Sequence, residues 1–447
     1  MRKFNNWMFV AALALFILPS CDYFSLDDPQ PVNEVTPANS ITDRQSAQAA
    51  VAGIYDELQD PTLVFDGYMM AWQLHSDETV FTGTFPTRLE FGNMNVFPSN
   101  GTWAAVFTDF YDVINVANNV IEVIPNVESV TLDQAGVRES FTAEARFARA
   151  LCYFYLVQAH GDVPLITKPT VSVGEELNVP ASSAADVMAQ VRADLEFAVT
   201  NLDPSLSLGA NADGANALLA RIALYEGRWA DAYNLATGVL GADFDLTTFP
   251  FLTDQIFSLE FISTDGNSLG FFYATDDLGG RHSIEPSATL MDAYTPEDNR
   301  AAQTFTMNPD GIPYGLKYSD FAGAANGQGV DPVMFVRHAE LVLIAAEAAA
   351  RQNDFTDASM WINQVRSRAG LADVTLDGSN FEDLILEERF LELAMEGGHR
   401  LWDLRRTGRA ESVLGGIGYE TCDAVWGLPQ RDIDRNTSLV QNGCCNC

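Results

Sequence analysis

Basic residues are scarce in this chain of 447 residues. Lys and Arg total 25 against 61 Asp and Glu, the formal net charge is −36, and the only lysines are Lys3, Lys168 and Lys317. Such a charge repels the phosphates of nucleic acids and the headgroups of anionic lipids, so it argues against both as partners. A solvated acidic surface is the simplest explanation of the excess.

The motifs of common enzyme classes are also missing. The sequence contains no H-E-x-x-H zinc motif, no Walker loop, no G-x-S-x-G elbow and no glycine pattern of a dinucleotide-binding fold. The five histidines are scattered through the chain: His75, His160, His282, His338 and His399. His338 and His399 fall in helical stretches, where we expect them to pack. The sequence therefore predicts no catalytic residue, no cofactor and no enzyme activity.

A long apolar run occurs only at the start of the chain. Arg2 and Lys3 precede twelve apolar residues, 7–18, and Leu18-Pro19-Ser20-Cys21 follows. The run is too short to span a bilayer, and this order is typical of a secretory signal. The cysteine predicts a lipoprotein signal peptide over residues 1–20, with Cys21 as the lipidated residue. An ordinary signal peptide cleaved elsewhere is the alternative.

The segment after Cys21 has the composition of a linker. Residues 21–39 combine Pro29, Pro31 and Pro37 with acidic residues, which predicts an extended acidic tether. The longest later apolar run, 341–346, is too short to span a membrane. Buried acyl carbons contribute about 0.8 kcal/mol each, so several acyl chains anchor a soluble domain stably. We therefore expect a protein that is attached to a membrane by lipid and does not cross it.

Six cysteines are few for a chain of this length, and four of them gather near its end: Cys422, Cys444, Cys445 and Cys447. Export favours disulfide bonds among these four, although their pairing cannot be read from the sequence. Zinc is the alternative, but the spacing matches no standard ligand pair and no histidine lies among them. Cys152 lies in an apolar helical stretch and is expected to be a core residue.

Helical periodicity prevails from residue 40 onwards, and one helical pattern occurs twice. Ala220, Ala223, Gly227, Trp229 and Ala232 recur 126 residues later as Ala346, Ala349, Asn353, Phe355 and Ala358. Each copy reads as helix, short turn, aromatic residue and second helix, which is typical of a tetratricopeptide hairpin. Such hairpins must stack to bury their apolar faces, and with the earlier helices we expect about four.

The segment between the two copies has a different composition. Residues 255–331 contain short β-prone stretches and are rich in Gly, Asp, Pro and Tyr, which predicts a loop-rich insert with little strand. We therefore divide the mature chain into an N-terminal helical region (40–254), this insert, and a C-terminal helical region with a tail (332–447). The predicted fold class is mainly α, with tetratricopeptide-like helix pairs.

Six blocks then occur in a characteristic order. They are 143–165, which includes Gly161-Asp162-Val163-Pro164; 217–227; 332–348, which includes Val336-Arg337-His338-Ala339-Glu340; 362–370; 385–408, which includes Glu387-Glu388-Arg389 and Asp403-Leu404-Arg405-Arg406; and the tail from Leu428-Pro429 to Gln441-Asn442-Gly443. Together they resemble the RagB/SusD family of outer-membrane nutrient-binding lipoproteins, over nearly the whole mature chain.

The resemblance implies a SusD-like α-α superhelix with a loop-rich ligand-binding part. It also implies a partner, a SusC-like TonB-dependent β-barrel transporter, over which the lipoprotein sits as a hinged lid. Ligands in the family are usually oligosaccharides and sometimes peptides. The resemblance further implies that the protein is anchored in the outer membrane and faces the cell surface.

A group of carboxylates in the fifth block invites a catalytic interpretation, because glycosidases use paired carboxylates. Glu388, Glu392 and Glu396 fall on one stripe of a helix, with Arg389 and Arg400 nearby. Neighbouring arginines favour ionised carboxylates, whereas a glycosidase acid must keep its proton. We therefore expect structural ion pairs that fix the last helices.

A sugar-binding site needs flat apolar rings with amides or carboxylates close by. Loop context selects Trp72, Phe81, Phe85, Phe97, Tyr294, Tyr314 and Tyr318 as candidate rings, and Asn93, Asn95 and Asn100 as candidate polar partners. Trp72 has a core position as its alternative. Four aspartates, Asp276, Asp277, Asp298 and Asp310, offer oxygen ligands for calcium, but their spacing is not that of an EF-hand, so we predict no metal site.

These observations predict a surface lipoprotein that binds a nutrient, most readily an oligosaccharide, and delivers it to a transporter. A peptide-binding member of the same family is one alternative. A tetratricopeptide scaffold that holds a protein tail in a helical groove is a second. A glycan hydrolase is a third, and it would require turnover that depends on Glu388 or Glu392.

Overall fold

A computed structural model describes residues 40–170, 178–248, 253–320 and 329–447. Residues 41–447 form one compact unit. The predicted signal peptide, the predicted lipidation site Cys21 and the predicted tether lie outside the described residues, and so does part of the predicted insert. Within the described residues, no helix is both long enough and apolar enough to cross a membrane.

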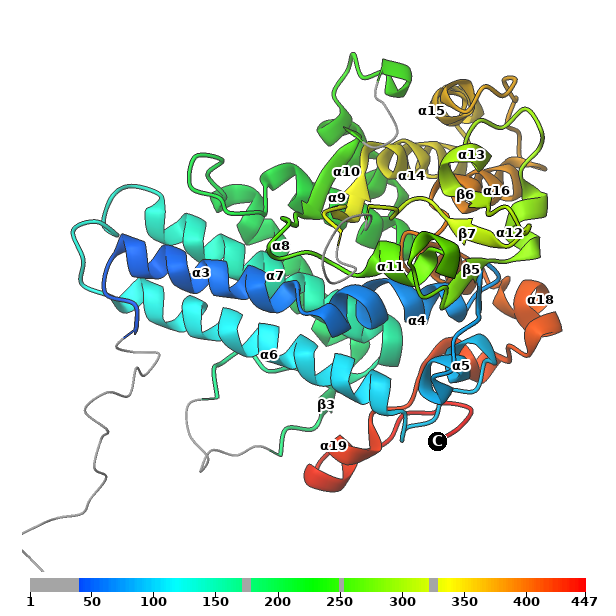
Figure 1. The fold of residues 1–447 in the computed structure, drawn as a ribbon. Helices are drawn as coiled ribbons and strands as arrows, with labels where there is room; N and C mark the ends of the chain where they lie inside the picture. Colours follow the sequence, from blue (N-terminus) through cyan, green and yellow to red (C-terminus); the bar gives the residue numbers. More distant parts are fainter. Residues whose placement is uncertain (1–39, 171–177, 249–252, 321–328) are drawn as a thin grey trace, which may run out of the picture. The chain divides into compact units, whose positions relative to one another are not determined.

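Long helices pack side by side and form the larger part of the unit (Figure 1). Neighbours in the sequence are mostly neighbours in space, since α6 contacts α7, α7 contacts α8, α8 contacts α9, α9 contacts α10, α10 contacts α14, and α14 contacts α15. The helices are α3 (Arg44–Leu58), α6 (Gly101–Val123), α7 (Val137–His160), α8 (Ala184–Asn201), α9 (Ala212–Tyr225), α10 (Trp229–Leu240), α14 (His338–Arg351), α15 (Phe355–Arg368), α16 (Phe381–Glu392) and α17 (His399–Arg406). The predicted mainly α class is confirmed.

The two copies of the repeated pattern fold as predicted, as the pairs α9–α10 and α14–α15. The turn residues at equivalent positions share a left-handed backbone, with φ of 70° at Gly227 and 65° at Asn353. Glycine and asparagine tolerate this conformation, which commonly ends a helix. The buried alanines Ala220, Ala223 and Ala346 let neighbouring helices approach closely. Contacts also link α3 with α6, α6 with α7 and α7 with α8, so the helices before α9 pack in sequence as well.

Short elements make up the remainder. The short helices are η1 (Leu63–Met70), α4 (Ala71–Leu74), α5 (Pro86–Gly92), η2 (Ile124–Asn126), η3 (Leu246–Thr248), α11 (Leu269–Tyr273), η5 (Asp276–Leu278), α12 (Ala288–Ala293), α13 (Ala301–Thr304), α18 (Ala410–Leu414), η6 (Gly415–Ile417), η7 (Thr421–Ala424) and α19 (Gln430–Arg435). The described strands form four antiparallel pairs: β1 (Thr79–Phe81) with β5 (Ile284–Pro286), β2 (Val163–Pro164) with β3 (Ala181–Ser182), β4 (Gln255–Leu259) with β8 (Val333–Arg337), and β6 (Phe305–Met307) with β7 (Pro313–Gly315).

Two of these pairs tie the predicted insert into the helical part. β4 opens the insert and pairs with β8, which directly precedes α14, while β5 pairs with β1 of the N-terminal region. Both pairings lie inside the single compact unit of residues 41–447, and the division into three regions stays a prediction.

An aromatic cluster occupies the core where the N-terminal and C-terminal regions meet. The rings of Trp72 and Trp426 stack with their centroids 4.6 Å apart, and Trp103 meets Trp426 edge-on at 4.5 Å. The Trp103 indole N–H donates to His160 Nε2 at 2.9 Å, and His160 Nδ1–H donates to the backbone oxygen of Trp426. Burial lowers the pKa of His160 to about 4, so its imidazole is neutral and both ring nitrogens have partners.

A buried network of ion pairs surrounds the three glutamates of α16 and the turn after it. Glu392 accepts from Arg337 at 3.1 Å and from Arg368, Glu388 lies 2.6 Å from Arg300, and Glu396 pairs with Arg337 at 2.7 Å and with Lys317. The carboxylates are therefore structural, as predicted. The predicted partners were wrong, because Arg389 binds Asp403 at 2.6 Å and Arg400 binds Asp77 at 2.8 Å. The basic side chains that pair with the three glutamates come from four other segments of the chain. The positions of the glutamates on their helix gave no indication of this.

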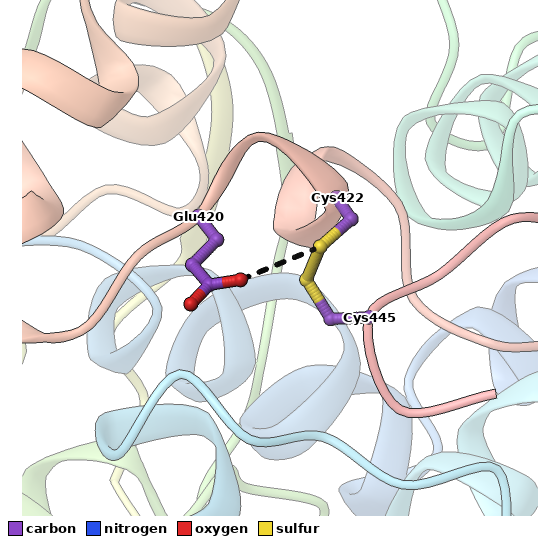
Figure 2. Close-up of side chains that lie close together, drawn as sticks. All are labelled: Glu420, Cys422 and Cys445. Carbon is purple, nitrogen blue, oxygen red and sulfur yellow. Dashed lines mark hydrogen bonds between the residues drawn. A yellow bond between two sulfur atoms is a disulfide. The ribbon is translucent and has the colours of Figure 1, made fainter.

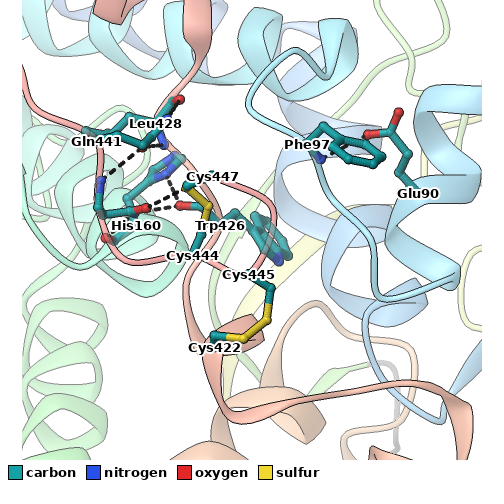
Figure 3. Close-up of a disulfide and its surroundings, with 11 residues drawn as sticks. Glu90, Phe97, His160, Cys422, Trp426, Leu428, Gln441, Cys444, Cys445 and Cys447 are labelled. Atoms are coloured by element: carbon teal, nitrogen blue, oxygen red, sulfur yellow. Dashed lines mark hydrogen bonds between the residues drawn. A yellow bond between two sulfur atoms is a disulfide. The ribbon is translucent and has the colours of Figure 1, made fainter.

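Two disulfide bonds fix the C-terminal tail, Cys422–Cys445 and Cys444–Cys447 (Figure 3). Disulfide bonding is confirmed, and the zinc alternative is not supported. Gln441 fastens the tail as well, because its amide donates to Leu428 O at 2.8 Å and its oxygen accepts from Leu428 N at 2.7 Å. Cys152 is buried in α7 as predicted, and burial raises the pKa of its thiol.

Candidate functional site

The two segments that sequence reasoning selected for ligand binding meet at the β1–β5 pair. Thr79 lies opposite Pro286 and Phe81 opposite Ile284. The pairing continues at both ends, where Thr82 N donates to Ser283 O at 2.9 Å and Ser287 N donates to Glu78 O at 2.9 Å. Residues about 200 positions apart are thereby held in one short ribbon.

Helix α5 lies beside this ribbon and has one exposed face. Leu89 lies on α5, and Phe85 and Asn93 are the residues immediately before and after this helix. Phe85 is 41% exposed and Leu89 42% exposed, and Asn93 is also exposed. Pro86 begins the helix, where its missing N–H costs nothing. The helix therefore presents two apolar side chains and one amide to solvent.

A cavity of about 320 Å³ lies between α5, the ribbon and the start of α12, and we call it the ribbon cavity. Its lining mixes apolar and hydrogen-bonding side chains: Leu74, Ser76, Asp77, Thr79, Val80, Phe81, Leu89, Gly92, Asn93, Ser287, Ala288, Thr289 and Ile417. The volume lies at the lower end of the range for small-molecule sites. Hydroxyl, amide and carboxylate groups beside apolar surface suit a polar ligand with apolar faces.

An ion pair fixes one wall of the ribbon cavity. Arg400 on α17 donates from Nε and Nη2 to the two Asp77 oxygens, each at 2.8 Å. The Arg400 guanidinium also lies 4.0 Å from the centroid of the Phe390 ring. Ser287 Oγ donates to Asp77 O and accepts from Leu290 N at 3.0 Å, so it also caps α12. Asp77 in this wall is therefore fixed by Arg400 on one side and by Ser287 on the other without any ligand.

Phe85 at the start of α5 lies between basic side chains. The guanidinium carbons of Arg88 and Arg281 each lie 4.9 Å from the centroid of its ring. Arg88 is held in turn by Asp66, through hydrogen bonds of 2.8 and 2.9 Å. The exposed Phe85 is therefore fixed in orientation by cation–π contacts.

The predicted ligand residues divide by exposure. Phe85, Phe97, Asn93 and Asn95 are exposed on α5 and the loop after it, and Figure 3 shows the Phe97 ring beside Glu90. Tyr314 is half-buried on β7, which packs against β5. Phe81 is 9% exposed but lines the ribbon cavity. These residues remain candidates for ligand contact.

The other predicted residues have structural positions. Trp72 belongs to the aromatic cluster and donates from Nε1 to Gly67 O at 2.7 Å. The Tyr294 hydroxyl donates to Leu391 O at 2.7 Å, and Tyr318 is buried against Tyr273. Asn100 caps α6 by accepting from Trp103 N at 2.9 Å. These four side chains are buried in the core, so we no longer propose them as ligand contacts.

Several cavity residues were not selected from the sequence. Leu89 could have been selected from the sequence, since it lies four residues from both Phe85 and Asn93, a spacing typical of one helix face. Ile417 had no such signal, because it comes from the C-terminal region and reaches the cavity only through folding. The same holds for Arg400, which does not line the cavity but holds Asp77 in its wall. Ser76 and Asp77 are short polar residues in a turn, and Thr289 is a short polar residue in the first turn of α12, so the sequence did not distinguish them from ordinary polar positions.

Two larger depressions lack the aromatic surface expected for sugar binding. One, of about 560 Å³, lies on α8, α9 and α10 and is lined by Glu196, Val199, Thr200, Asn216, Leu219, Arg228, Asp231, Asn234 and Leu235. The other, of about 510 Å³, is lined by His160, Gly161, Asp162, Pro180, Ala181, Leu428, Ser438, Val440, Gln441, Asn442 and Gly443. Among the described lining residues of both there is no Phe, Tyr or Trp.

The structure offers no cluster suited to a metal ion in its described part. Of the four aspartates considered for calcium, Asp298 binds Arg300 at 2.7 Å and Asp277 accepts from Asn308 at 2.8 Å. The one described group of three metal-capable side chains is Glu420 with Cys422 and Cys445 (Figure 2). Its two sulfurs are bonded to one another, so they are not thiolates and do not fit a metal.

Two family models match the chain. The model described as the SusD family matches residues 280–423, and the model described as "Starch-binding associating with outer membrane" matches residues 70–224. A SusD-like protein of Formosa agariphila is 28% identical over 520 aligned positions, which cover 99% of each chain. A second SusD-like protein of that organism is 25% identical, over 93% of this chain and 95% of its own.

Solved structures share the fold. A SusD superfamily protein from Bacteroides vulgatus superposes with a TM-score of 0.79 at 21% identity, over 90% of this chain and 99% of that one. A laminarin-binding SusD-like protein gives a TM-score of 0.77 at 23% identity, over 90% and 99% of the two chains. Surface glycan-binding protein A from Bacteroides thetaiotaomicron, in complex with laminarihexaose, gives 0.74 at 20% identity, over 90% and 100%.

Proposed function

Since this chain belongs to the SusD/RagB family, whose members bind without catalysing, we propose that it is a glycan-binding lipoprotein of the outer membrane that delivers an oligosaccharide to a TonB-dependent transporter. Cys21 is its proposed point of lipid attachment. A SusC-like β-barrel is its proposed partner, over which the protein acts as a lid. Ligand binding then favours the closed arrangement of lid and barrel.

The observation that supports this function best is the position of the ribbon cavity. Its first wall, from Leu74 to Asn93, belongs to the segment matched by the starch-binding model, and Ser287–Thr289 and Ile417 belong to the segment matched by the SusD model. The cavity therefore forms where the two matched parts of the chain meet, and neither part completes it alone.

The chemistry of the site fits a saccharide. Val80, Phe81 and Leu89 offer apolar contact, and Thr79, Thr289 and Asn93 offer groups that both donate and accept. The single carboxylate in the lining, Asp77, is held by Arg400, whereas glycoside hydrolysis uses two free carboxyl groups on either side of the bond. Binding without turnover is the activity that this arrangement supports.

The test is a binding measurement on the mature chain with Cys21→Ser in place of the lipid. Titration calorimetry against a glycan panel that includes laminarihexaose, the ligand of a structural relative, should find at least one ligand. Leu89→Asp places a charge in the cavity and should abolish that binding. Met360→Asp, an equally drastic change at an exposed side chain on α15, should not alter it.

Each outcome has a distinct meaning. Binding that survives Leu89→Asp would place the ligand elsewhere. A chain that binds no glycan but binds peptides would favour the peptide-binding alternative. Peptide binding that is lost on Asn234→Arg, at an exposed residue in the depression on α8, α9 and α10, would favour the tetratricopeptide scaffold. Hydrolysis of any bound glycan would contradict the proposed function.

A further inference from the structure

Glu78 is a buried carboxyl group directly behind the ribbon cavity. It follows Ser76 and Asp77, which line the cavity, and its side chain is itself buried in the core. Oε1 accepts a hydrogen bond of 3.0 Å from the backbone N–H of Met395, in the turn between α16 and α17. Met395 has a left-handed backbone with φ of 61°. Glu78 therefore joins the cavity wall to the turn that leads to Arg400.

The hydrogen bonds of Ser76 indicate where the proton between the Ser76 hydroxyl and the Glu78 carboxyl group lies. Ser76 Oγ is 2.8 Å from Gln73 O and 3.3 Å from Glu78 Oε2. A hydroxyl has one proton to donate, and the shorter contact leads to a carbonyl that can only accept, so the proton points to Gln73. The two lone pairs of Ser76 Oγ then face the Glu78 backbone N–H, at 3.2 Å, and Glu78 Oε2. An ionised Glu78 would set a carboxylate oxygen against a lone pair.

We propose that Glu78 is protonated in the folded protein at neutral pH and, by donating to Ser76 Oγ, positions the wall of the ribbon cavity for its ligand. The carboxyl group then has a donor role at Oε2 and an acceptor role at Oε1. Ser76 in turn completes one donated and two accepted hydrogen bonds. The part of this proposal that concerns ligand affinity rests on the proposed function.

Charged and titratable groups face Glu78 from four directions. Asp77 beside it disfavours a second negative charge, whereas Arg400 on α17 and Lys317, which follows β7, favour one. The Tyr273 hydroxyl on α11 faces it as a neutral group, and donates to Gln73 Oε1 at 2.6 Å. Burial is the largest influence and raises the pKa of Glu78 to about 8. This direction agrees with the hydrogen-bond geometry.

Protonation of Glu78 couples folding to pH. The carboxyl group of the unfolded chain loses its proton near its ordinary pKa of 4.5, and the folded one keeps it up to about pH 8. Folding therefore takes up a proton between these values. The stabilising contribution is complete below the lower value and is lost as the pH rises through the window. The effect on the folding equilibrium constant reaches up to about tenfold per pH unit.

The experiment compares the pH dependence of unfolding in the wild-type chain and in Glu78→Gln. A glutamine amide can donate to Ser76 Oγ and accept from Met395 N, so it imitates the protonated acid without titrating. The folding equilibrium constant of Glu78→Gln relative to that of wild type should rise up to about tenfold per pH unit between about pH 5.5 and 7.5. Glu297→Gln, the same change at an exposed residue, should keep a constant ratio to wild type. A constant ratio for Glu78→Gln would overturn the proposal.

Two further measurements keep the proposal testable if Glu78→Gln folds poorly or binds nothing. Amide hydrogen exchange of the wild-type segment 73–80 should accelerate above pH 8 beyond the intrinsic increase measured on the unfolded chain, and exchange without that acceleration would count against it. For a glycan found in the panel, wild-type affinity should fall severalfold between pH 6.5 and pH 9, while Glu78→Gln holds its affinity. If the unfolding result holds and no glycan binds, the proposed function fails and the protonated Glu78 stands.

Discussion

Arg400 binds both carboxylate oxygens of Asp77 across 323 residues of sequence. The pair joins α17, in the C-terminal region, to the segment between α4 and β1, and both side chains are largely buried. A paired guanidinium and carboxylate in this setting fixes orientation, because the two parallel hydrogen bonds admit one geometry. The shape of one cavity wall thus depends on a residue far along the chain.

Breaking this pair should destabilise the protein and weaken ligand binding together. Arg400→Met should cost about 2 kcal/mol in the free energy of unfolding, because it leaves the Asp77 carboxylate partly buried without its partner. Asp77→Asn combined with Arg400→Met should recover part of that loss. Urea unfolding at pH 7 measures the loss of stability in Arg400→Met and its partial recovery in the double variant. Arg435→Met, at an exposed arginine, should cost less than about 0.5 kcal/mol. An equal loss of unfolding free energy in Arg400→Met and Arg435→Met would show that the Asp77–Arg400 pair does not stabilise the protein.

The glutamate at the centre of the buried ion network should dominate stability in acid. Burial opposes the ionisation of Glu392, but Arg368, Arg337 and Arg300 outweigh it and hold its pKa well below the ordinary value. Glu392→Gln leaves these arginines without a central carboxylate and should cost about 3–5 kcal/mol. The neighbouring Glu387 is exposed, so Glu387→Gln should be nearly neutral.

The same network predicts the direction of the pH dependence. The folded-state pKa of Glu392 lies below its unfolded value of 4.5, so its contribution is present above pH 4.5 and is lost as the pH falls below it. As the pH falls below 4.5, the free energy of unfolding should therefore decrease less steeply for Glu392→Gln than for wild type. Parallel curves would mean that Glu392 is not ionised in the folded protein.

The disulfide Cys422–Cys445 should stabilise the tail by restricting the unfolded chain. It spans 23 residues, and closing a loop of this size contributes about 3 kcal/mol in the chain-entropy model, whereas Cys444–Cys447 closes a much shorter one. The double variant Cys422→Ser/Cys445→Ser should lower the Tm by several degrees, and Cys444→Ser/Cys447→Ser by less. Peptide mapping without reductant checks the pairing. Stoichiometric zinc in the purified protein would contradict it.

The repeated turns allow a matched test of backbone conformation. Gly227→Ala forces a side chain into the left-handed region and should cost about 1 kcal/mol. Asn353→Gly, at the equivalent turn of the second pair, should change stability by only a few tenths of a kcal/mol. Gly238→Ala lies inside α10 with open space around it and should stabilise by about 0.5–1 kcal/mol. The same sign for Gly227→Ala and Gly238→Ala would contradict this account of the turns.

The features that depend on local interactions could be predicted from the sequence. The turns at Gly227 and Asn353 were predicted from spacing, because helices and their caps depend on residues a few positions apart. The structural role of Glu388, Glu392 and Glu396 was predicted as well, since so many acidic and basic residues in a helical block must pair when buried. Of the predicted ligand residues, Asn93 lines the ribbon cavity and Phe85 is exposed at the start of α5, and their contact with a ligand stays a prediction.

Sequence reasoning failed where packing between distant segments decides. Trp72 and Phe85 both come from an aromatic segment of mixed composition, yet Trp72 is buried against Trp426, 354 positions later in the chain, whereas Phe85 is exposed. Arg389 and Arg400 lie close to the three glutamates in sequence, but Asp403 and Asp77 bind them instead. A single sequence contains no signal for such pairings.

The sequence by itself determined the helical pairs, the acidic surface and the clustering of cysteines in the tail, because each follows from composition or from spacing within a few turns of chain. Only the tertiary structure decided which rings face solvent, which arginine holds which carboxylate, and that Glu78 sits against Ser76 behind the ribbon cavity. Burial and the protonation of a carboxyl group depend on the low-polarity surroundings that remote segments create when they pack, and no local pattern records those surroundings.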